Sequence, residues 1–301
     1  MRSFMSLAAE YFLRFNGYKK KINDVLKMSD YLEERHVANE KVYEIPASVR
    51  MKSKLKKETV DTMDVYYINK NEKRNKLILY FHGGGYVEQP VAQHWQFLDK
   101  IALATDAEII VPIYPKAPEY QYMESIERLL TIYQSQLSNT DAGNIIFMGD
   151  SAGGGLALAL AEYLLESELP QPAKIILLSP WLDITMENTD IQSLDAKDPS
   201  LGIYGLIQMG KAWAGTTDAK HYLLSPLYGK ILGLGKISVF VGEHELFLAD
   251  ARKFRDFAKS QNVEINYYEY PKMNHVFPLY PIPEARKAQK QIIDIINGRI
   301  R

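Results

Sequence analysis

The stretch at positions 149–154, which reads GDSAGG, limits what this chain can fold into more than any other. Residues 144–148 before it form a short apolar run that is typical of a buried strand. Residues 155–165 after it have high helix propensity throughout. A serine between glycines, where a strand turns sharply into a helix, is the context of a G-x-S-x-G nucleophile elbow. The sequence therefore predicts that Ser151 is raised above the edge of a sheet on a strained turn.

The predicted elbow leaves no room for side chains at Gly149 and Gly153, which would collide with the neighbouring strand and helix. It also places the Ala152 N–H and the positive end of a helix dipole beside Ser151, where an oxyanion would form. The same short pattern arises by chance, and glycine–serine turns before helices often only cap the helix. A catalytic serine therefore needs support from the rest of the chain.

The length and composition are those of a globular protein that can hold an enzyme core. A chain of 301 residues can bury about three quarters of its unfolded surface and so hold a full enzyme core. The net charge of -1 argues against a nucleic-acid partner, which usually binds a basic excess. Without cysteine, the chain has no thiol nucleophile, thiolate metal ligand or disulfide. The chain also lacks the phosphate-loop and dinucleotide fingerprints. We expect neither a metal nor a cofactor.

The first 43 residues read as two helical runs that precede the sheet. In the first run, one apolar face recurs at helical spacing, and it consists of Phe4, Leu7, Ala8, Tyr11, Phe12 and Phe15. After a break at Asn16-Gly17 and three lysines, a second run at 22–34 should bury Ile22, Val25, Leu26 and Leu32. Such a face, followed by lysines, could lie on a membrane surface. Packing against the chain's own domain is the more frequent role, and we expect packing.

No stretch of the sequence approaches the roughly 18 apolar residues that a membrane span needs. Near the N-terminus, Glu10 and Arg14 interrupt the apolar run that a signal peptide requires. We therefore expect a cytoplasmic protein without stable membrane insertion.

From residue 43 onward, strand-like and helix-like segments alternate. Strands are expected near 43–55, 58–67, 77–81, 108–113, 144–148, 174–178, 237–241 and 265–270, and helices near 94–104, 123–137, 155–165, 250–260 and 283–297. A polar loop is expected at 69–76. This alternation indicates an α/β fold with a doubly wound, mostly parallel sheet. An exposed edge strand after the elbow unit offers a surface for a second copy, so a homodimer stays open as a partner.

A second glycine-rich stretch, His82 and the three glycines after it, follows directly on the apolar strand 77–81. Three glycines at a strand end let backbone N–H groups point into the space above the sheet. Together with the Ala152 N–H, they form a donor set for the oxyanion of an acyl-transfer intermediate. A glycine-rich turn without a ligand is the plainer interpretation, but the elbow downstream favours the oxyanion hole. We expect His82 to hold the loop by hydrogen bonds rather than to carry protons.

A nucleophilic serine needs an orienting acid and a base, and in such folds the acid follows the serine in the chain and the histidine base comes last. His275 lies in the loop after the last expected strand, which is the place of the base. The remaining histidines lack this position: His36, His94 and His221 are away from the sheet edge, and His244 is on the loop of the acid. Glu245 fits the acid best, a few residues past the strand 237–241. The alternatives are Asp250, which we expect to cap the helix 250–260, and Glu243, which could face away.

Together these motifs resemble the hormone-sensitive-lipase-like branch of the α/β-hydrolase superfamily, which includes many bacterial carboxylesterases. The resemblance rests on HGGG at 82–85, GDSAGG at 149–154 and the spacing of the triad. YPKAPE at 114–119 is similar to the family's Y-R-L-A-P-E, and SPWLD at 179–183 to its S-P-W-x-D. The match runs from about residue 76 to the C-terminus, whereas residues 1–43 match only as a helical cap of suitable size.

The resemblance implies an α/β-hydrolase catalytic domain at 44–301, with an N-terminal cap segment at 1–43 and a cap insertion at about 185–217. It implies that Gly84, Gly85 and Ala152 supply the oxyanion donors. The insertion carries apolar side chains that could line an acyl pocket or simply pack the cap: Leu201, Ile203, Tyr204, Leu206, Ile207, Met209 and Trp213.

Two positions depart from the family pattern. Glu245 stands where the family usually has aspartate, and its longer side chain changes the geometry of the loop while it can do the same work. Lys116 replaces the usual arginine of Y-R-L-A-P-E. Because lysine lacks the planar fork of arginine, a structural ion pair at Lys116 is expected to differ.

The sequence therefore predicts a serine carboxylesterase or lipase that hydrolyses short- to medium-chain acyl esters through Ser151, His275 and Glu245, with a small-molecule ester as its partner. An amidase, peptidase or deacetylase on the same triad would differ only in its cap contacts. A non-catalytic small-molecule receptor would have lost a member of the triad, and here serine, acid and histidine are all present.

Overall fold

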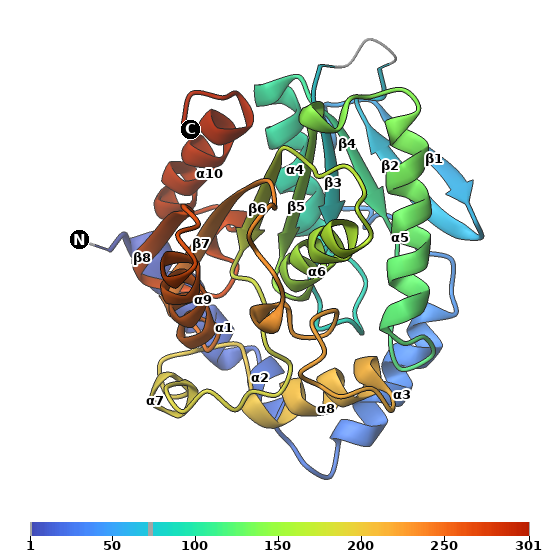
Figure 1. Cartoon of the computed structure of the whole chain (residues 1–301). Helices are drawn as coiled ribbons and strands as arrows, with labels where there is room; N and C mark the ends of the chain where they lie inside the picture. Colours follow the sequence, from blue (N-terminus) through green and yellow to red (C-terminus); the bar gives the residue numbers. More distant parts are fainter. Residues whose placement is uncertain (1, 72–74, 301) are drawn as a thin grey trace.

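The computed structural model describes residues 2–71 and 75–300. Within these residues, eight strands form one central sheet with the order β1-β2-β4-β3-β5-β6-β7-β8 (Figure 1). The strands are β1 (Leu55–Val60), β2 (Met63–Ile68), β3 (Leu77–Phe81), β4 (Glu108–Pro112), β5 (Ile145–Asp150), β6 (Lys174–Leu178), β7 (Lys236–His244) and β8 (Asn266–Asn274). Strand β2 runs antiparallel to both of its neighbours, and the pairs from β4 to β8 are parallel. The predicted α/β class with a mostly parallel sheet is confirmed.

Helices cover both faces of this sheet (Figure 1). They are α1 (Phe4–Phe15), α2 (Tyr18–Ile22), α3 (Met28–Asn39), α4 (Ala92–Thr105), α5 (Tyr122–Leu137), α6 (Ala152–Glu166), α7 (Ile191–Leu194), α8 (Ile203–Ala214), α9 (Leu248–Ser260) and α10 (Pro283–Ile296). Helices α4 and α10 share one hydrophobic core with the sheet, and α5, α6 and α9 share the other. The sheet thus lies between two apolar layers, as a doubly wound fold requires.

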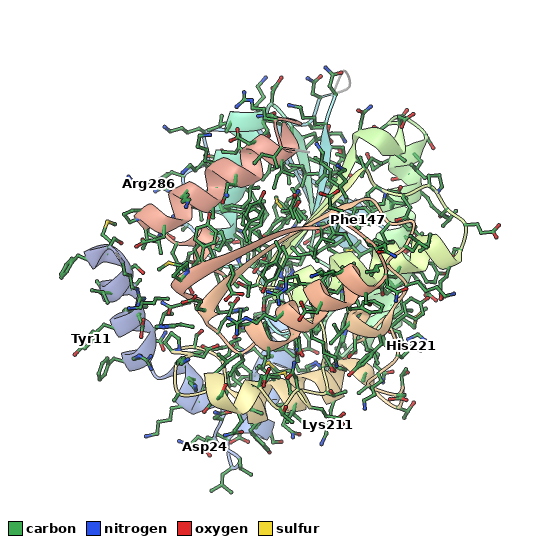
Figure 2. All side chains as sticks on the ribbon, turned by 60° about the vertical axis from the view of Figure 1, so that its left-hand side comes forward. Tyr11, Asp24, Phe147, Lys211, His221 and Arg286 are labelled. Atoms are coloured by element: carbon green, nitrogen blue, oxygen red, sulfur yellow. The ribbon has the colours of Figure 1, made fainter. Side chains whose placement is uncertain are left out.

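Strand β3 shows why these segments read as continuous apolar runs. Leu77, Leu79 and Phe81 enter the core on the α5–α6 side, while Ile78 and Tyr80 enter the core on the α4–α10 side. Because side chains alternate between faces and both faces are buried, each position of the strand must be apolar. Figure 2 shows the same division, with Phe147 of β5 in the interior and Arg286 of α10 at the surface.

The first expected strand, at 43–55, is wrong. The chain is irregular there until β1 begins at Leu55, and the antiparallel hairpin is built from β1 and β2. The turn between them contains Asp61 and Thr62, both with positive φ (47° and 62°). Asp-Thr lacks the glycine that usually marks a two-residue hairpin turn. The hairpin therefore had no clear boundary in the sequence. The loop expected at 69–76 lies partly outside the described residues.

The expected helix at 22–34 is confirmed at 28–34 only, since α2 ends at Ile22 and α3 begins at Met28. Asn23 interrupts the helix because its Oδ1 accepts the Tyr204 N–H at 3.1 Å, at the start of α8. Of the side chains expected to be buried, Ile22 is buried, but Val25 and Leu26 are 65% and 89% exposed. The residue that ends α2 thus also contacts the start of α8, which is distant in the sequence.

Helix α1 forms as expected but presents its apolar face to solvent. Phe4 is 83% exposed and Phe15 is 69% exposed, and Figure 2 shows Tyr11 pointing away from the molecule. The polar side of the helix makes the contacts instead: Ser3 Oγ donates to Glu284 of α10 at 2.8 Å, and Ser6 is buried. The expectation that this apolar face packs on its own domain is therefore wrong.

The segments expected to form a cap gather at one end of the sheet. Helices α2 and α3 contact α8, and α7 lies near them at the bottom of Figure 1. None of the helices in the described part of the chain has the length and apolar content needed to traverse a bilayer.

Candidate active site

The sharp turn after β5 holds Ser151 in an unusual backbone conformation. Its φ is 54° and its ψ is −124°, which L-residues rarely adopt. The Ser151 N–H donates to the Leu178 carbonyl at 2.9 Å, and the Ser151 carbonyl accepts from the Trp181 N–H at 2.9 Å. These two bonds hold the turn against β6 and the segment that follows it.

The glycines beside Ser151 are required by close approach of the backbone. A Cβ on Gly149 would lie 2.2 Å from the carbonyl oxygen of Gly153, and a Cβ on Gly153 would lie 2.0 Å from that of Phe81. Both distances are far below any contact distance, so the collision predicted from the sequence is confirmed. Strand β5 can therefore pass directly into α6 only with glycine at these positions.

Ser151, His275 and Glu245 form a row of hydrogen bonds at the carboxyl ends of the strands. His275 Nε2 is 2.9 Å from Ser151 Oγ, and His275 Nδ1 is 2.8 Å from Glu245 Oε2. Glu245 is fully buried, and its Oε1 accepts the Gly242 N–H at 3.0 Å. Glu245 follows β7 directly and His275 follows β8 directly, which brings both to one edge of the sheet. The structure thus brings together three residues that the sequence singled out.

The two alternative acids lie elsewhere. Glu243 Oε2 accepts the N–H of Lys272 at 3.0 Å. Asp250 Oδ1 accepts from Asn188 Nδ2 at 2.8 Å. Asp250 is not the N-cap of α9, as the sequence suggested, because the helix begins at Leu248 and Asp250 is buried in its first turn. The hydrogen bonds of His275 go to Glu245 and Ser151 instead.

The glycine-rich stretch after β3 faces the elbow. Gly84 and Gly85 have φ of 120° and 60°, in the region that glycine adopts most readily. Their N–H groups bond to no acceptor among residues 2–71 and 75–300. Ala152 is the first residue of α6, where a helical N–H has no intrahelical partner. Three backbone donors are thus left unpaired near Ser151.

His82 is fully buried and holds this glycine-rich stretch in place. Its Nδ1 lies 2.7 Å from the carbonyl of Gly83, and its own carbonyl accepts from the Tyr114 hydroxyl at 2.6 Å. Burial lowers the pKa of the His82 imidazole well below its usual value. The ring is therefore neutral near pH 7 and donates a hydrogen bond, in line with the expected structural role.

Asp150, directly before the serine, joins the two glycine-rich segments and was not assigned a role from the sequence. Its carboxylate accepts from the Tyr80 hydroxyl at 2.6 Å and the Gly83 N–H at 3.0 Å, and it lies 3.2 Å from His94 Nε2. Burial alone would raise the pKa of this carboxyl, but His94 and the hydrogen bonds outweigh burial and lower it. Since His94 Nδ1 accepts the Val91 N–H, the proton of the ring is on Nε2, and Nε2–H donates a hydrogen bond to Asp150. The sequence feature that could have pointed to this role is the position of the aspartate inside GDSAGG.

A family described as the alpha/beta hydrolase fold matches residues 78–279, which is more than half of the chain. The chain belongs to the alpha/beta hydrolase family. The match includes both glycine-rich segments and reaches past His275.

Two characterised relatives of this hydrolase are similar over most of their length. An esterase of Acinetobacter venetianus is 31% identical over 236 residues, covering 74% of this chain and 75% of the relative. An acetyl-hydrolase of Streptomyces hygroscopicus is 28% identical over 233 residues, covering 76% of this chain and 78% of the relative.

Solved structures agree with these relatives. A candidate esterase from Staphylococcus aureus is 34% identical, with a TM-score of 0.90 over 95% of this chain and 98% of that chain. A hormone-sensitive lipase from a metagenome library is 26% identical, with a TM-score of 0.85 over the whole of both chains. The resemblance to the hormone-sensitive-lipase-like branch is confirmed, and this hydrolase is a carboxylic ester hydrolase.

The pocket of the hydrolase that contains Ser151 and His275, here called the serine pocket, has a volume of about 360 Å³. Its apolar wall comes from α1, α2, α8 and the segment before α8: Phe12, Leu13, Ile22, Leu201, Leu206 and Met209. Of the insertion residues considered from the sequence, Trp213 packs instead against Tyr86, with parallel rings 4.4 Å apart. Across the described residues, no group of three histidine, aspartate or glutamate side chains could hold a metal ion.

Proposed function

We propose that this hydrolase is a serine carboxylesterase that cleaves short- to medium-chain acyl esters with Ser151 as nucleophile, His275 as base and Glu245 as orienting acid. The observation that carries the proposal is the row of contacts of 2.8 Å and 2.9 Å from Glu245 through His275 to Ser151. Because the buried carboxylate accepts a hydrogen bond from Nδ1–H, the unprotonated Nε2 is left free to accept a proton from the hydroxyl.

In the first half-reaction, Ser151 Oγ attacks the ester carbonyl carbon while its proton passes to His275 Nε2. The oxyanion that forms is bound by the N–H groups of Gly84, Gly85 and Ala152, which have no competing acceptor within the described residues. The C–O bond to the alcohol then breaks, and His275 returns the proton to the leaving oxygen. The imidazolium that exists between these steps is stabilised by Glu245.

In the second half-reaction, water attacks the acyl-serine ester and gives its proton to His275. The same N–H groups bind the second oxyanion. The Ser151–acyl bond breaks, Ser151 regains its proton from His275, and the carboxylic acid leaves. No metal or cofactor takes part in this scheme.

We further propose that residues 1–43 and the insertion at about 185–217 act together as a cap on a catalytic domain at 44–301. Contacts of α2 and α3 with α8, and the contributions of α1, α2 and α8 to the serine pocket, support this division. A largely apolar pocket of about 360 Å³ suits the acyl part of a short or medium ester.

The test is hydrolysis of p-nitrophenyl esters from acetate to laurate by the full chain, with Ser151→Ala as control. We expect turnover to be highest between acetate and hexanoate and to disappear in Ser151→Ala. A fluorophosphonate probe should label the wild type and leave Ser151→Ala unlabelled. Labelling without ester turnover would indicate an amidase, peptidase or deacetylase, and absence of labelling would indicate a receptor.

We also propose that this hydrolase forms a homodimer and is located in the cytoplasm. The edge strand β8 bonds to β7 alone within the sheet, so its outer side is available to a second copy. A chain without cysteine needs no oxidising compartment. Light scattering coupled to size exclusion would contradict the dimer if the mass stayed at 34.5 kDa across concentrations. Cell fractionation would contradict the location if the protein were recovered outside the cytoplasm.

A further inference from the structure

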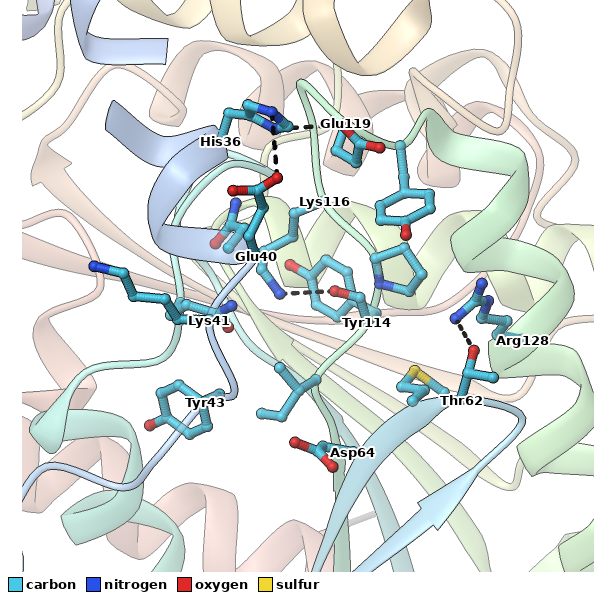
Figure 3. Close-up of a pocket in the computed structure, with 16 residues that line it drawn as sticks. His36, Glu40, Lys41, Tyr43, Thr62, Asp64, Tyr114, Lys116, Glu119 and Arg128 are labelled. Carbon is cyan, nitrogen blue, oxygen red and sulfur yellow. Dashed lines mark hydrogen bonds and ion pairs between the residues drawn. The ribbon is translucent and has the colours of Figure 1, made fainter. Parts of the chain in front are cut away.

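A second pocket lies between the end of α3, the β1–β2 turn and the segment after β4 (Figure 3). We call it the Lys116 pocket. Its volume is about 470 Å³, and the residue that its lining shares with the serine pocket is Gln89. The chemistry proposed for Ser151 uses none of its side chains.

Lys116 is the buried charge of this pocket. Its side chain extends from the segment after β4 into the pocket (Figure 3), and the residue is only 4% exposed. An ammonium carries three donors, but Nζ makes one hydrogen bond, of 2.7 Å, to the Tyr114 carbonyl, and lies 5.2 Å from the centre of the Tyr114 ring. Burial without a carboxylate partner lowers the pKa of Lys116 to about 7. A buried ammonium with spare donors is costly unless an anion pairs with it.

Three carboxylates line the pocket: Asp64 has a lysine partner, and Glu40 and Glu119 share one histidine. Asp64 lies 2.7 Å from Lys57. Glu119 and Glu40 lie 3.3 Å and 3.9 Å from His36, and Figure 3 shows both contacts.

The cations of the lining, in contrast, lack carboxylate partners among residues 2–71 and 75–300. Arg128 donates to Thr62 Oγ1 at 2.9 Å and to a backbone carbonyl. Lys41 and Lys116 likewise pair with no carboxylate in that part of the chain. Lys116 therefore has donors that no carboxylate of the described residues uses.

The rest of the lining includes apolar and aromatic side chains, namely Met63, Ile113, Pro115 and Tyr120. A hydrated inorganic anion would leave these surfaces without a partner, whereas a carboxylate with an apolar body would use both features. We propose that the Lys116 pocket binds an organic carboxylate with a small apolar body, and that Lys116 donates the hydrogen bonds that hold its charged end.

Hydrogen bonds connect the segment of Lys116 with the segment that carries Gly84 and Gly85. The Tyr114 hydroxyl donates to the His82 carbonyl at 2.6 Å, and the Tyr86 carbonyl accepts the Ala117 N–H at 2.9 Å. Lys116 thus lies between two residues that hold the glycine-rich stretch. Lys116, which would bind the carboxylate, is therefore next to Ala117 and two residues from Tyr114, the residues that make these contacts.

The test is calorimetric titration of the full chain with benzoate, with neutral benzamide as the uncharged control. We expect saturable benzoate binding in the millimolar range or tighter and much weaker benzamide binding. Lys116→Met keeps the length of the side chain but removes the charge, and it should weaken benzoate about tenfold or more. The matched control is Lys230→Met, which removes a lysine with a 77% exposed side chain and should leave the affinity unchanged.

A second readout needs no variant. Benzoate pairs with the protonated amine, so its affinity for the wild type should be constant below about pH 7 and fall about tenfold per unit above it. Equal affinity of wild type and a folded Lys116→Met would overturn the proposal. So would equal binding of benzamide, no saturable benzoate binding, or an affinity that does not change with pH. Because the readout is binding, the proposed esterase mechanism can fail without affecting this result.

Discussion

At the scale of a single residue, the environment of Glu245 determines which groups its carboxylate contacts. It is fully buried, and its two oxygens are used by His275 Nδ1 and the Gly242 N–H. The contact with Nδ1 fixes the tautomer of His275. The longer side chain, compared with the aspartate usual in the related family, therefore still reaches the imidazole.

Replacing this carboxylate should abolish most of the turnover. We expect Glu245→Gln to lower kcat about a thousand- to ten-thousandfold, because the amide no longer stabilises the imidazolium and selects the wrong tautomer. Asp250→Asn is the matched control, since Asp250 bonds to Asn188, and its kcat should stay within about twofold of the wild type. Steady-state kinetics on the best p-nitrophenyl ester checks both. The reverse ranking of the two variants would assign the acid to Asp250.

At the scale of the element, α1 shows that an amphipathic pattern does not reveal which side of a helix faces the protein. Its serines reach Glu284 and Met273, and its aromatic face is left in solvent. The C-terminal part of the same helix nevertheless contributes Phe12 and Leu13 to the serine pocket.

This position predicts different effects for two phenylalanines of α1. Phe12→Ser should raise KM for p-nitrophenyl hexanoate several-fold and leave KM for the acetate nearly unchanged, because the longer acyl chain loses an apolar contact. Phe4→Ser removes a side chain that is 83% exposed and outside the pocket lining, so KM for both esters should stay at the wild-type value. Equal effects of the two substitutions would argue against α1 as a wall of the substrate site.

At the scale of the whole molecule, one buried carboxyl makes stability depend on pH. Burial raises the pKa of Asp250 to about 6, with its bond to Asn188 acting in the opposite direction. The folded state thus binds this proton more tightly than the unfolded state, so its stabilising contribution is full below about pH 4 and is lost as pH rises through about 6. The total loss is roughly 3 kcal/mol.

Asp250→Asn removes this titration. We expect the stability of the variant relative to the wild type to increase by roughly 3 kcal/mol between about pH 4 and pH 8. Any constant cost of the amide cancels in this difference. Urea unfolding of both proteins at the two pH values provides the measurement. A difference that is the same at both values would show that Asp250 is not protonated on folding.

Much of the fold and the site could be predicted from local sequence. Strands β3 and β6 span the residues expected for them, because an apolar run between polar segments has few other ways to be buried. Ser151 and its glycines were predictable since the turn itself excludes other residues. Asn23, Asp150 and His94 could not be understood in the same way, because their partners are distant in the chain.

The sequence by itself determined the mostly parallel sheet and the elbow with Ser151, because these depend on short-range sterics and on apolar runs. Only the tertiary structure decided that Glu245 rather than Glu243 or Asp250 meets His275, that α1 turns its apolar face outward, and that Lys116 is buried without a carboxylate. Each of these depends on which distant segments come together around one side chain. A one-dimensional pattern records the residue but not its neighbours.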